Sequence, residues 1–133
     1  MRYCFASLIL LAACDMGGPG FRGVDPMRVS IDGSQFSVRQ ADGRVEVLRT
    51  NSEIAFQRQG MTAKMVQAIE LTTGCTLVEG SLRGDQVQAT GRLKCAGKAA
   101  SSRISAGQTL ICKTPASATR NGVTTVVTEL DCF

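Results

Sequence analysis

Histidine is absent from the 133 residues, and its absence removes the commonest catalytic designs. A Ser-His-Asp or Cys-His arrangement needs an imidazole, and so does most acid–base chemistry near neutral pH. The Ser-x-x-Lys pattern of a serine–lysine dyad does not occur either. Carboxylates remain at Glu53, Glu70, Glu79 and Asp131, but their spacing brings no two of them together as glycoside hydrolysis requires. We therefore predict no catalytic residues and a protein that is not an enzyme.

Tryptophan is also absent, Tyr3 is the single tyrosine, and only five phenylalanines occur. Sites for bases and sugars stack these rings on aromatic side chains, which are scarce here. The formal net charge of +4 is mild and spread along the chain without a basic cluster, so nucleic acid is not expected as a partner. Without His and without a Cys-x-x-Cys pair we expect no metal site, and no motif indicates a cofactor.

A short apolar run near the N-terminus ends at a cysteine. Arg2 is the only charge before residue 15, and the uncharged residues 5–13 are far fewer than the roughly 20 of a membrane span. The run ends in Leu-Ala-Ala-Cys at residues 11–14, which resembles the lipobox of bacterial lipoprotein precursors. The resemblance implies cleavage before Cys14 and acylation of its thiol. A buried N-terminal helix and an ordinary secretory signal are the alternatives, and neither needs a cysteine at this point.

The lipoprotein interpretation divides the chain into three parts. Residues 1–13 form the signal peptide, residues 14–26 the lipidated cysteine with a flexible Gly- and Pro-rich tether, and residues 27–133 a single domain. The membrane is then a partner through the lipid anchor, and the protein lies in the bacterial cell envelope, facing the periplasm. Asp15 resembles the inner-membrane retention signal of enteric bacteria. That rule varies among bacterial groups, so both the inner and the outer membrane stay open.

Four cysteines follow Cys14, an even number that favours two disulfides in a small exported domain. Cys75 to Cys95 and Cys112 to Cys132 each enclose 19 residues and look like hairpins with stapled ends. A two-residue turn in either hairpin misses direct pairing of its cysteines by one residue. Bulged strands, three-residue loops and other cysteine pairings all fit this offset. Because the offset recurs, we favour bulged hairpins with Cys75–Cys95 and Cys112–Cys132 bridges.

Each cysteine segment contains an Arg followed by a turn pair. The two expected hairpin tips are Arg83, Gly84 and Asp85 in the first segment and Arg120, Asn121 and Gly122 in the second. We expect these tips to be points of contact with a protein partner. The first tip also matches the Arg-Gly-Asp tripeptide of integrin-binding loops. Because many hairpins need such a turn pair anyway, turn formation is the preferred interpretation.

The segment before Gly60 predicts antiparallel strands. Apolar and polar residues alternate over residues 27–31, 35–40 and 44–49, with turn signals at Asp32-Gly33 and Asp42-Gly43. This alternation indicates a sheet with one buried face and one wet face. Residues 53–58 are a candidate for a further strand.

One amphipathic helix of about three turns is expected after Gly60. Its apolar face comprises Met61, Met65, Ala68, Ile69 and Thr72. Thr62 is expected as the N-cap and Gly74 as the C-cap. The two methionines lack a neighbouring His and are core residues rather than copper ligands. The predicted fold class is α+β: a small antiparallel sheet of hairpins packed by one amphipathic helix, with two disulfides.

The stretch from Ala68 to Cys95, with Thr73-Gly74-Cys75 and residues 80–85, is similar to small lipoproteins of α-proteobacteria. This similarity implies no activity. The expected function is that of a non-enzymatic, membrane-anchored envelope lipoprotein that binds or supports another envelope component. The alternative is an inhibitor of a secreted or host hydrolase, such as a lysozyme or a protease.

Overall fold

The computed structural model describes residues 15–53, 60–96, 104–105, 107–114, 118–120, 123–125 and 131–133. The predicted signal peptide (residues 1–13), Cys14, Asn121, Gly122 and nearly all of the candidate strand over 53–58 lie outside the described residues. The described elements are β1 (Met27–Ile31), β2 (Ser34–Ala41), β3 (Arg44–Arg49), α1 (Met61–Thr73), β4 (Thr76–Leu77), β5 (Arg83–Gly84), β6 (Gln88–Lys94), β7 (Thr109–Lys113), β8 (Ala118–Arg120), β9 (Val123–Thr125) and β10 (Asp131–Cys132).

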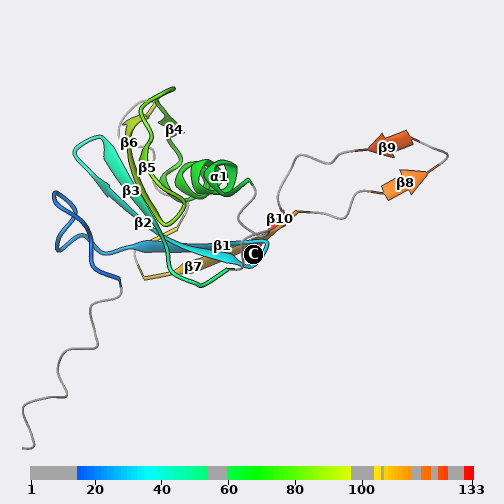
Figure 1. The fold of residues 1–133 in the computed structure, drawn as a ribbon, viewed down its shortest axis with the longest axis horizontal. Helices are drawn as coiled ribbons and strands as arrows, with labels where there is room; N and C mark the ends of the chain where they lie inside the picture. The colour runs from blue at the N-terminus through cyan, green and yellow to red at the C-terminus, as the bar shows by residue number, and fades with distance from the viewer. Residues whose placement is uncertain are drawn as a thin grey trace, which may run out of the picture.

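The α+β fold class is confirmed, but the main sheet is mixed rather than purely antiparallel (Figure 1). Its strands lie in the order β10-β7-β1-β2-β3-β6-β4, and β5 also pairs with β6. The strands pair antiparallel except for β1 and β7, which run parallel. Hairpin signals report only strands that are neighbours in sequence. They could not reveal that β7 fills the open edge of β1.

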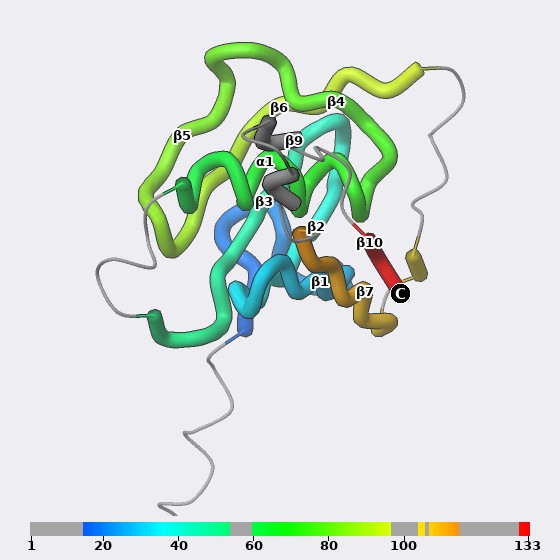
Figure 2. The backbone as a smooth tube through the Cα atoms, turned by 90° about the vertical axis from the view of Figure 1, so that its right-hand side faces the viewer, coloured from blue at the N-terminus to red at the C-terminus, as the bar shows by residue number. Residues whose placement is uncertain are grey.

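The sheet curls around α1, as a view turned by 90° makes clear (Figure 2). The helix contacts β1, β2, β3 and β4, so a single helix covers the inner face of the sheet. The chain between residues 27 and 49 follows the sequence prediction closely. Asp32-Gly33 joins β1 to β2 and Asp42-Gly43 joins β2 to β3, and all four residues have positive φ, between 47° and 83°. These are the left-handed conformations that tight two-residue hairpins require, and Asp and Gly tolerate them.

The first disulfide hairpin turns at a different place from the one predicted. Arg83 pairs with Thr90 and Gly84 with Ala89, so the chain turns over residues 85–88. The predicted two-residue turn at Gly84-Asp85 is therefore wrong. The turn lies later in the sequence because the Asp85 carboxylate accepts hydrogen bonds from the backbone N–H groups of Val87 and Gln88, which closes a wider loop.

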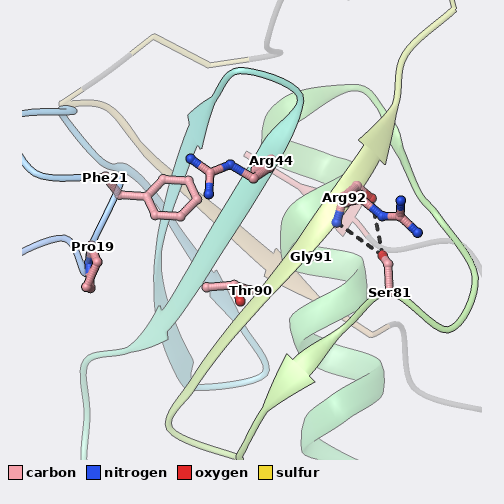
Figure 3. A pocket seen from close by; sticks show the side chains of 7 residues that line it. All are labelled: Pro19, Phe21, Arg44, Ser81, Thr90, Gly91 and Arg92. Carbon is pink, nitrogen blue, oxygen red and sulfur yellow. Dashed lines mark hydrogen bonds between the residues drawn. The ribbon is translucent and has the colours of Figure 1, made fainter.

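A bulge in this hairpin restores the register of its cysteines. Leu77 pairs with Leu93, so residues 78–82 stand opposite only Gly91 and Arg92. The Ser81 hydroxyl accepts the N–H of Arg92 and donates to its carbonyl oxygen, which ties the bulge to β6 (Figure 3). The predicted one-residue bulge is thus an insertion of three residues. Beyond it, the expected Cys75–Cys95 disulfide forms, with the Cα atoms 4.5 Å apart.

The second disulfide, Cys112–Cys132, is also confirmed and joins directly paired residues of β7 and β10. In the small sheet of β8 and β9, Arg120 pairs with Val123, so two residues connect these strands, as predicted. If the β8–β9 register continued to the cysteines, Cys112 would pair with Asp131, whereas it pairs with Cys132. This difference of one residue is the offset that the sequence indicated. Each bridge spans a sequence separation of 20, which stabilises the fold by about 3 kcal/mol through the unfolded chain.

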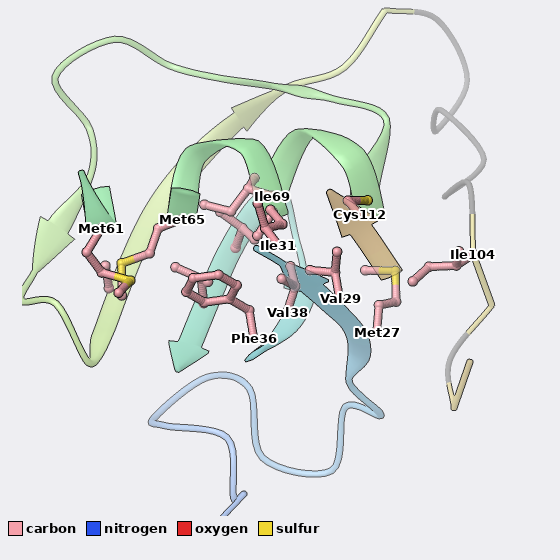
Figure 4. Packing of buried hydrophobic residues seen from close by; sticks show 14 residues of the cluster. Met27, Val29, Ile31, Phe36, Val38, Met61, Met65, Ile69, Ile104 and Cys112 are labelled. Atoms are coloured by element: carbon pink, nitrogen blue, oxygen red, sulfur yellow. The ribbon is translucent and has the colours of Figure 1, made fainter. Parts of the chain in front are cut away.

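The core lies between α1 and the inner face of the sheet (Figure 4). The predicted apolar face of the helix is confirmed, because Met61, Met65, Ala68, Ile69 and Thr72 are all buried. The predicted C-cap is also confirmed: Gly74 is left-handed and donates to the carbonyl of Glu70. Thr62 is not the N-cap. The N-cap is the left-handed Gly60, two residues earlier, and the helix begins at Met61 without a side-chain cap.

Candidate functional site

Residues 15–26 lie against the outer face of the sheet, the face turned away from α1. Phe21 is only 2% exposed, and the N–H of Gly18 donates to Oε1 of Glu46 at 2.8 Å. This is the segment for which we predicted a flexible tether, and its contacts instead make residues 15–26 part of the folded domain. The glycines permit close approach here: a Cβ on Gly18 would lie 2.5 Å from the Glu46 carboxylate.

Asp15, which directly follows Cys14 in the sequence, fixes the start of this segment. Its Oδ1 accepts a hydrogen bond from Nη2 of Arg39 at 2.9 Å. Its Oδ2 accepts hydrogen bonds from Ser37 Oγ at 2.9 Å and from Arg28 Nη2 at 3.1 Å. The backbone carbonyl of Asp15 also accepts from Arg39. Three side chains on β1 and β2 therefore hold the first described residue.

Arg39 and Glu46 form a buried pair beneath the segment. Their side chains are 3% and 0% exposed, and Arg39 Nη1 lies 3.8 Å from Glu46 Oε2. Glu46 Oε1 accepts from Gly18 N–H and from Gln88 Nε2, both at 2.8 Å. Arg39 Nε donates to the carbonyl of Val24 at 3.1 Å. The two charges are thus hydrogen-bonded to both ends of the N-terminal segment, which excludes water from them.

Two opposing effects act on the pKa of Asp15. Partial burial raises it, but hydrogen bonds from Arg39 and Ser37 and the positive charge of Arg39 outweigh burial. The pKa of Asp15 therefore lies below its ordinary value of 3.8. The carboxylate is ionised at neutral pH and stabilises the attachment of residues 15–26 to the sheet.

The first predicted tip is exposed, but its charged side chains bind their own loop. Arg83 Nη1 donates to the carbonyls of Gly80 and Leu82, at 2.7 and 3.0 Å. Asp85 Oδ1 accepts from Val87 N–H at 2.7 Å and from Gln88 N–H at 2.9 Å, and these bonds lower the pKa of Asp85. An adhesion motif must offer both charges to a receptor. Here Arg83 is bonded to the bulge before β5 and Asp85 to the turn after it, which favours a structural role of these residues over adhesion.

Of the second predicted tip, only the backbone of Arg120 falls within the described residues. It is the last residue of β8 and pairs with Val123 of β9. The structure therefore does not bring the two predicted tips into one described site.

A cavity of about 300 Å³ opens between the N-terminal segment and β6, next to two arginines (Figure 3). Arg44 and Arg92 are directly paired across β3 and β6, which is an unfavourable placement for like charges. Figure 3 shows that Arg44 points toward Phe21, whose ring centroid lies 5.6 Å from the guanidinium carbon, whereas Arg92 points past Ser81. The two guanidinium groups flank the cavity and do not converge in it.

The four carboxylates considered for catalysis lie on separate elements. Glu53 lies 3.9 Å from the Arg49 guanidinium, Glu70 lies on α1, Glu79 lies in the bulge after β4, and Asp131 pairs with Lys113 across β10 and β7. Among the described residues, no group of three or more His, Cys, Asp or Glu side chains could hold a metal ion.

Sequence reasoning missed the cluster of Asp15, Arg39 and Glu46. Arg39 and Glu46 occupy polar positions in alternating strands, and that pattern marks residues of a wet face. The one available signal was Phe21, a large apolar residue inside a Gly- and Pro-rich segment. It needed a surface to cover, and the sheet beneath it supplies that surface.

Comparisons with protein-family models, with curated proteins and with solved structures each found no match to this chain. In the part of the chain that the structure describes, no helix has the length and apolar character needed to cross a membrane.

We predict that Arg39→Met lowers the free energy of unfolding by about 3–5 kcal/mol, because it leaves Glu46 buried without its partner. Arg92→Met, an exposed arginine on the same face, is the matched control and should change stability by no more than about 0.5 kcal/mol. Urea denaturation measures both. Adding Glu46→Gln to Arg39→Met should recover part of the loss. Equal stability of Arg39→Met and Arg92→Met would contradict this role for the buried pair.

Asp15→Asn should remove an acid-dependent part of the stability. Since the folded-state pKa of Asp15 lies below 3.8, its contribution is fully present above that pH and is lost as pH falls through the folded-state pKa. The urea midpoint of Asp15→Asn should therefore lie below that of the native chain at pH 6, and the two should converge as pH falls through the folded-state pKa of Asp15. The matched control is Asp25→Asn, at an exposed position of the same segment. A midpoint difference for Asp15→Asn that does not change with pH would refute the prediction.

Proposed function

We propose that this chain is a lipid-anchored protein of the bacterial cell envelope that binds another envelope component and catalyses no reaction. The observation that carries this proposal is the pair of disulfides, Cys75–Cys95 and Cys112–Cys132. Such bonds persist in oxidising compartments, which a chain with an export signal reaches. The apolar run ending at Cys14 supplies that signal and offers the thiol that would carry the lipid.

The proposal of a binding role takes account of where the described carboxylates lie. On the outer face, Glu46 Oε1 accepts hydrogen bonds from Gly18 N–H and Gln88 Nε2, and Glu46 Oε2 lies 3.8 Å from Arg39 Nη1. Glu53, Glu70, Glu79 and Asp131 lie on separate elements, as described above.

Replacing Cys14 by Ser tests the anchor. In cells given labelled palmitate, the native protein should incorporate the label and float with membranes. The Cys14→Ser variant should remain an uncleaved precursor without label. A matched control is Cys4→Ser, which removes a thiol from the signal peptide and should leave labelling intact. Labelling of Cys14→Ser equal to that of the native protein would exclude this attachment site.

A second candidate function, inhibition of a secreted or host hydrolase, is favoured by the turn over residues 85–88. This loop is exposed and internally braced by Asp85, and Val87 at its tip is 46% exposed. A braced loop with an apolar tip loses little conformational entropy on entering a cleft. One side of the loop is bonded to β3, because the Val87 carbonyl accepts the N–H of Arg49 at 2.7 Å.

If the loop inhibits a hydrolase, Val87→Asp should weaken inhibition at least tenfold, since it would place a charge in an apolar subsite. Ile111→Asp, at another exposed apolar position, is the control and should inhibit like the native protein. Inhibition constants against a lysozyme and a trypsin-like protease provide the measurement. Equal inhibition by both variants, or none by the native protein, would reject this candidate for these two classes.

A further inference from the structure

Exposed apolar side chains gather on the outer face of the sheet. Four large apolar side chains are exposed in the described part of the chain, namely Met16 (63%), Val87 (46%), Ile111 (40%) and Phe133 (70%). Ile111 and Phe133 are direct neighbours, because the N–H of each donates to the carbonyl of the other, at 3.1 and 2.9 Å. In β7, Ile111 alternates with the buried Cys112, so it points away from α1. Phe133, beside Ile111, lies on the same face.

The start of the N-terminal segment lies on this same face. Arg28, which binds Asp15, is one strand away from Ile111 and two residues along, a distance of roughly 8 Å at ordinary sheet spacing. Met16 follows Asp15 and lines a surface cavity with Arg22 and Arg39. In Figure 2, the described chain begins near β1, on the side opposite α1, and β7 lies on that side as well. Met16 and Ile111 are therefore near the chain that leads to Cys14, and Phe133 lies one strand beyond Ile111 on the same face.

No linker residues lie between Cys14 and Asp15, the first residue held on the sheet. Consecutive Cα atoms are about 3.8 Å apart, and Asp15 is already held by Arg28, Ser37 and Arg39. A lipid on Cys14 would enter the bilayer within a few bonds of this surface. The domain cannot stand away from the membrane as it would on a tether of a dozen flexible residues.

We propose that the outer face of the sheet, with Met16, Ile111 and Phe133 as its apolar contacts, rests on the phospholipid surface. This inference rests on the proposed function, because it takes the lipid on Cys14 as given. Amphipathic surfaces of this kind insert apolar side chains to the depth of the headgroup boundary. The helix α1 and its exposed residues then face away from the membrane, where they are open to a partner.

Charge contributes little to this contact. Beside the apolar contacts, the cations Arg22 and Lys113 are accompanied by the acids Asp25 and Asp131, and Lys113 is paired directly with Asp131 across β7 and β10. The exposed Arg44 and Arg92 lie on the same face but farther along the sheet, on β3 and β6. Arg28 is engaged with Asp15. The contact should therefore persist at high salt and with zwitterionic lipid, unlike the electrostatic binding of a basic patch.

Because the chain contains no tryptophan, a single Trp can report the orientation. Phe133→Trp places the probe on the outer face, and Gln67→Trp places it on the exposed side of α1 as the matched control. Each acylated variant is reconstituted in vesicles of phosphatidylethanolamine and phosphatidylglycerol that contain brominated phosphatidylcholine, which quenches only nearby fluorophores. We expect at least threefold stronger quenching at position 133 than at position 67, unchanged in 0.5 M salt.

Ile111→Trp is the second probe of the outer face and should behave like Phe133→Trp if the latter disturbs β10. Palmitate labelling of the same preparations separates the two proposals. Acylated protein with equal quenching at positions 67, 111 and 133 would overturn the membrane-resting face and leave the lipid anchor standing. Protein without acylation would overturn both.

Discussion

The arrangement of this domain depends on one buried charge, the guanidinium group of Arg39. It lies between Asp15 on the N-terminal segment and Glu46 on β3, and it is 3% exposed. A buried charge is costly unless it is paired and hydrogen-bonded. Detachment of the segment that covers Arg39 would remove its Asp15 partner, so the attachment of this segment contributes to the stability of the fold. The same contacts define the outer face of the sheet and determine where the chain that leads to Cys14 approaches it.

Arg39 also explains why the two faces of the sheet differ. The inner face is apolar and is covered by α1, through residues such as Phe36, Val38 and Val47. The outer face carries polar residues and is covered in part by residues 15–26, while Ile111 and Phe133 remain exposed beside it. A single layer of strands is thus enclosed on one side by a helix and on the other by an irregular segment. Disulfides fix the two strand pairs farthest from β2, where little core is available.

Local signals predicted the local parts of this fold well. Asp32-Gly33 and Asp42-Gly43 specify tight turns by backbone conformation alone, and the spacing of Met61, Met65 and Ile69 specifies a helical face. Parallel pairing of β1 with β7 joins residues about eighty apart, and no local pattern encodes it. The predicted turn at Gly84-Asp85 was wrong because the Asp85 side chain accepts hydrogen bonds from backbone N–H groups two and three residues later, which moves the turn to residues 85–88. Of the site residues, the cysteine pairs followed from spacing, whereas Asp15 and Arg39 could not be paired without the fold.

The composition of residues 15–26 is misleading for a physical reason. Gly and Pro favour loops, and a loop is flexible only when nothing holds it. Here a Cβ at Gly17 would collide with the backbone carbonyl oxygen of Phe21, so this position needs glycine, and the buried Phe21 side chain supplies the apolar contact that fixes the loop. An anchored domain with a free tether samples many orientations, and a partner must select among them. Under the proposed lipid anchor, a domain held through Asp15 would have few orientations relative to the lipid, so the fold itself would determine which surface is presented to the proposed partner.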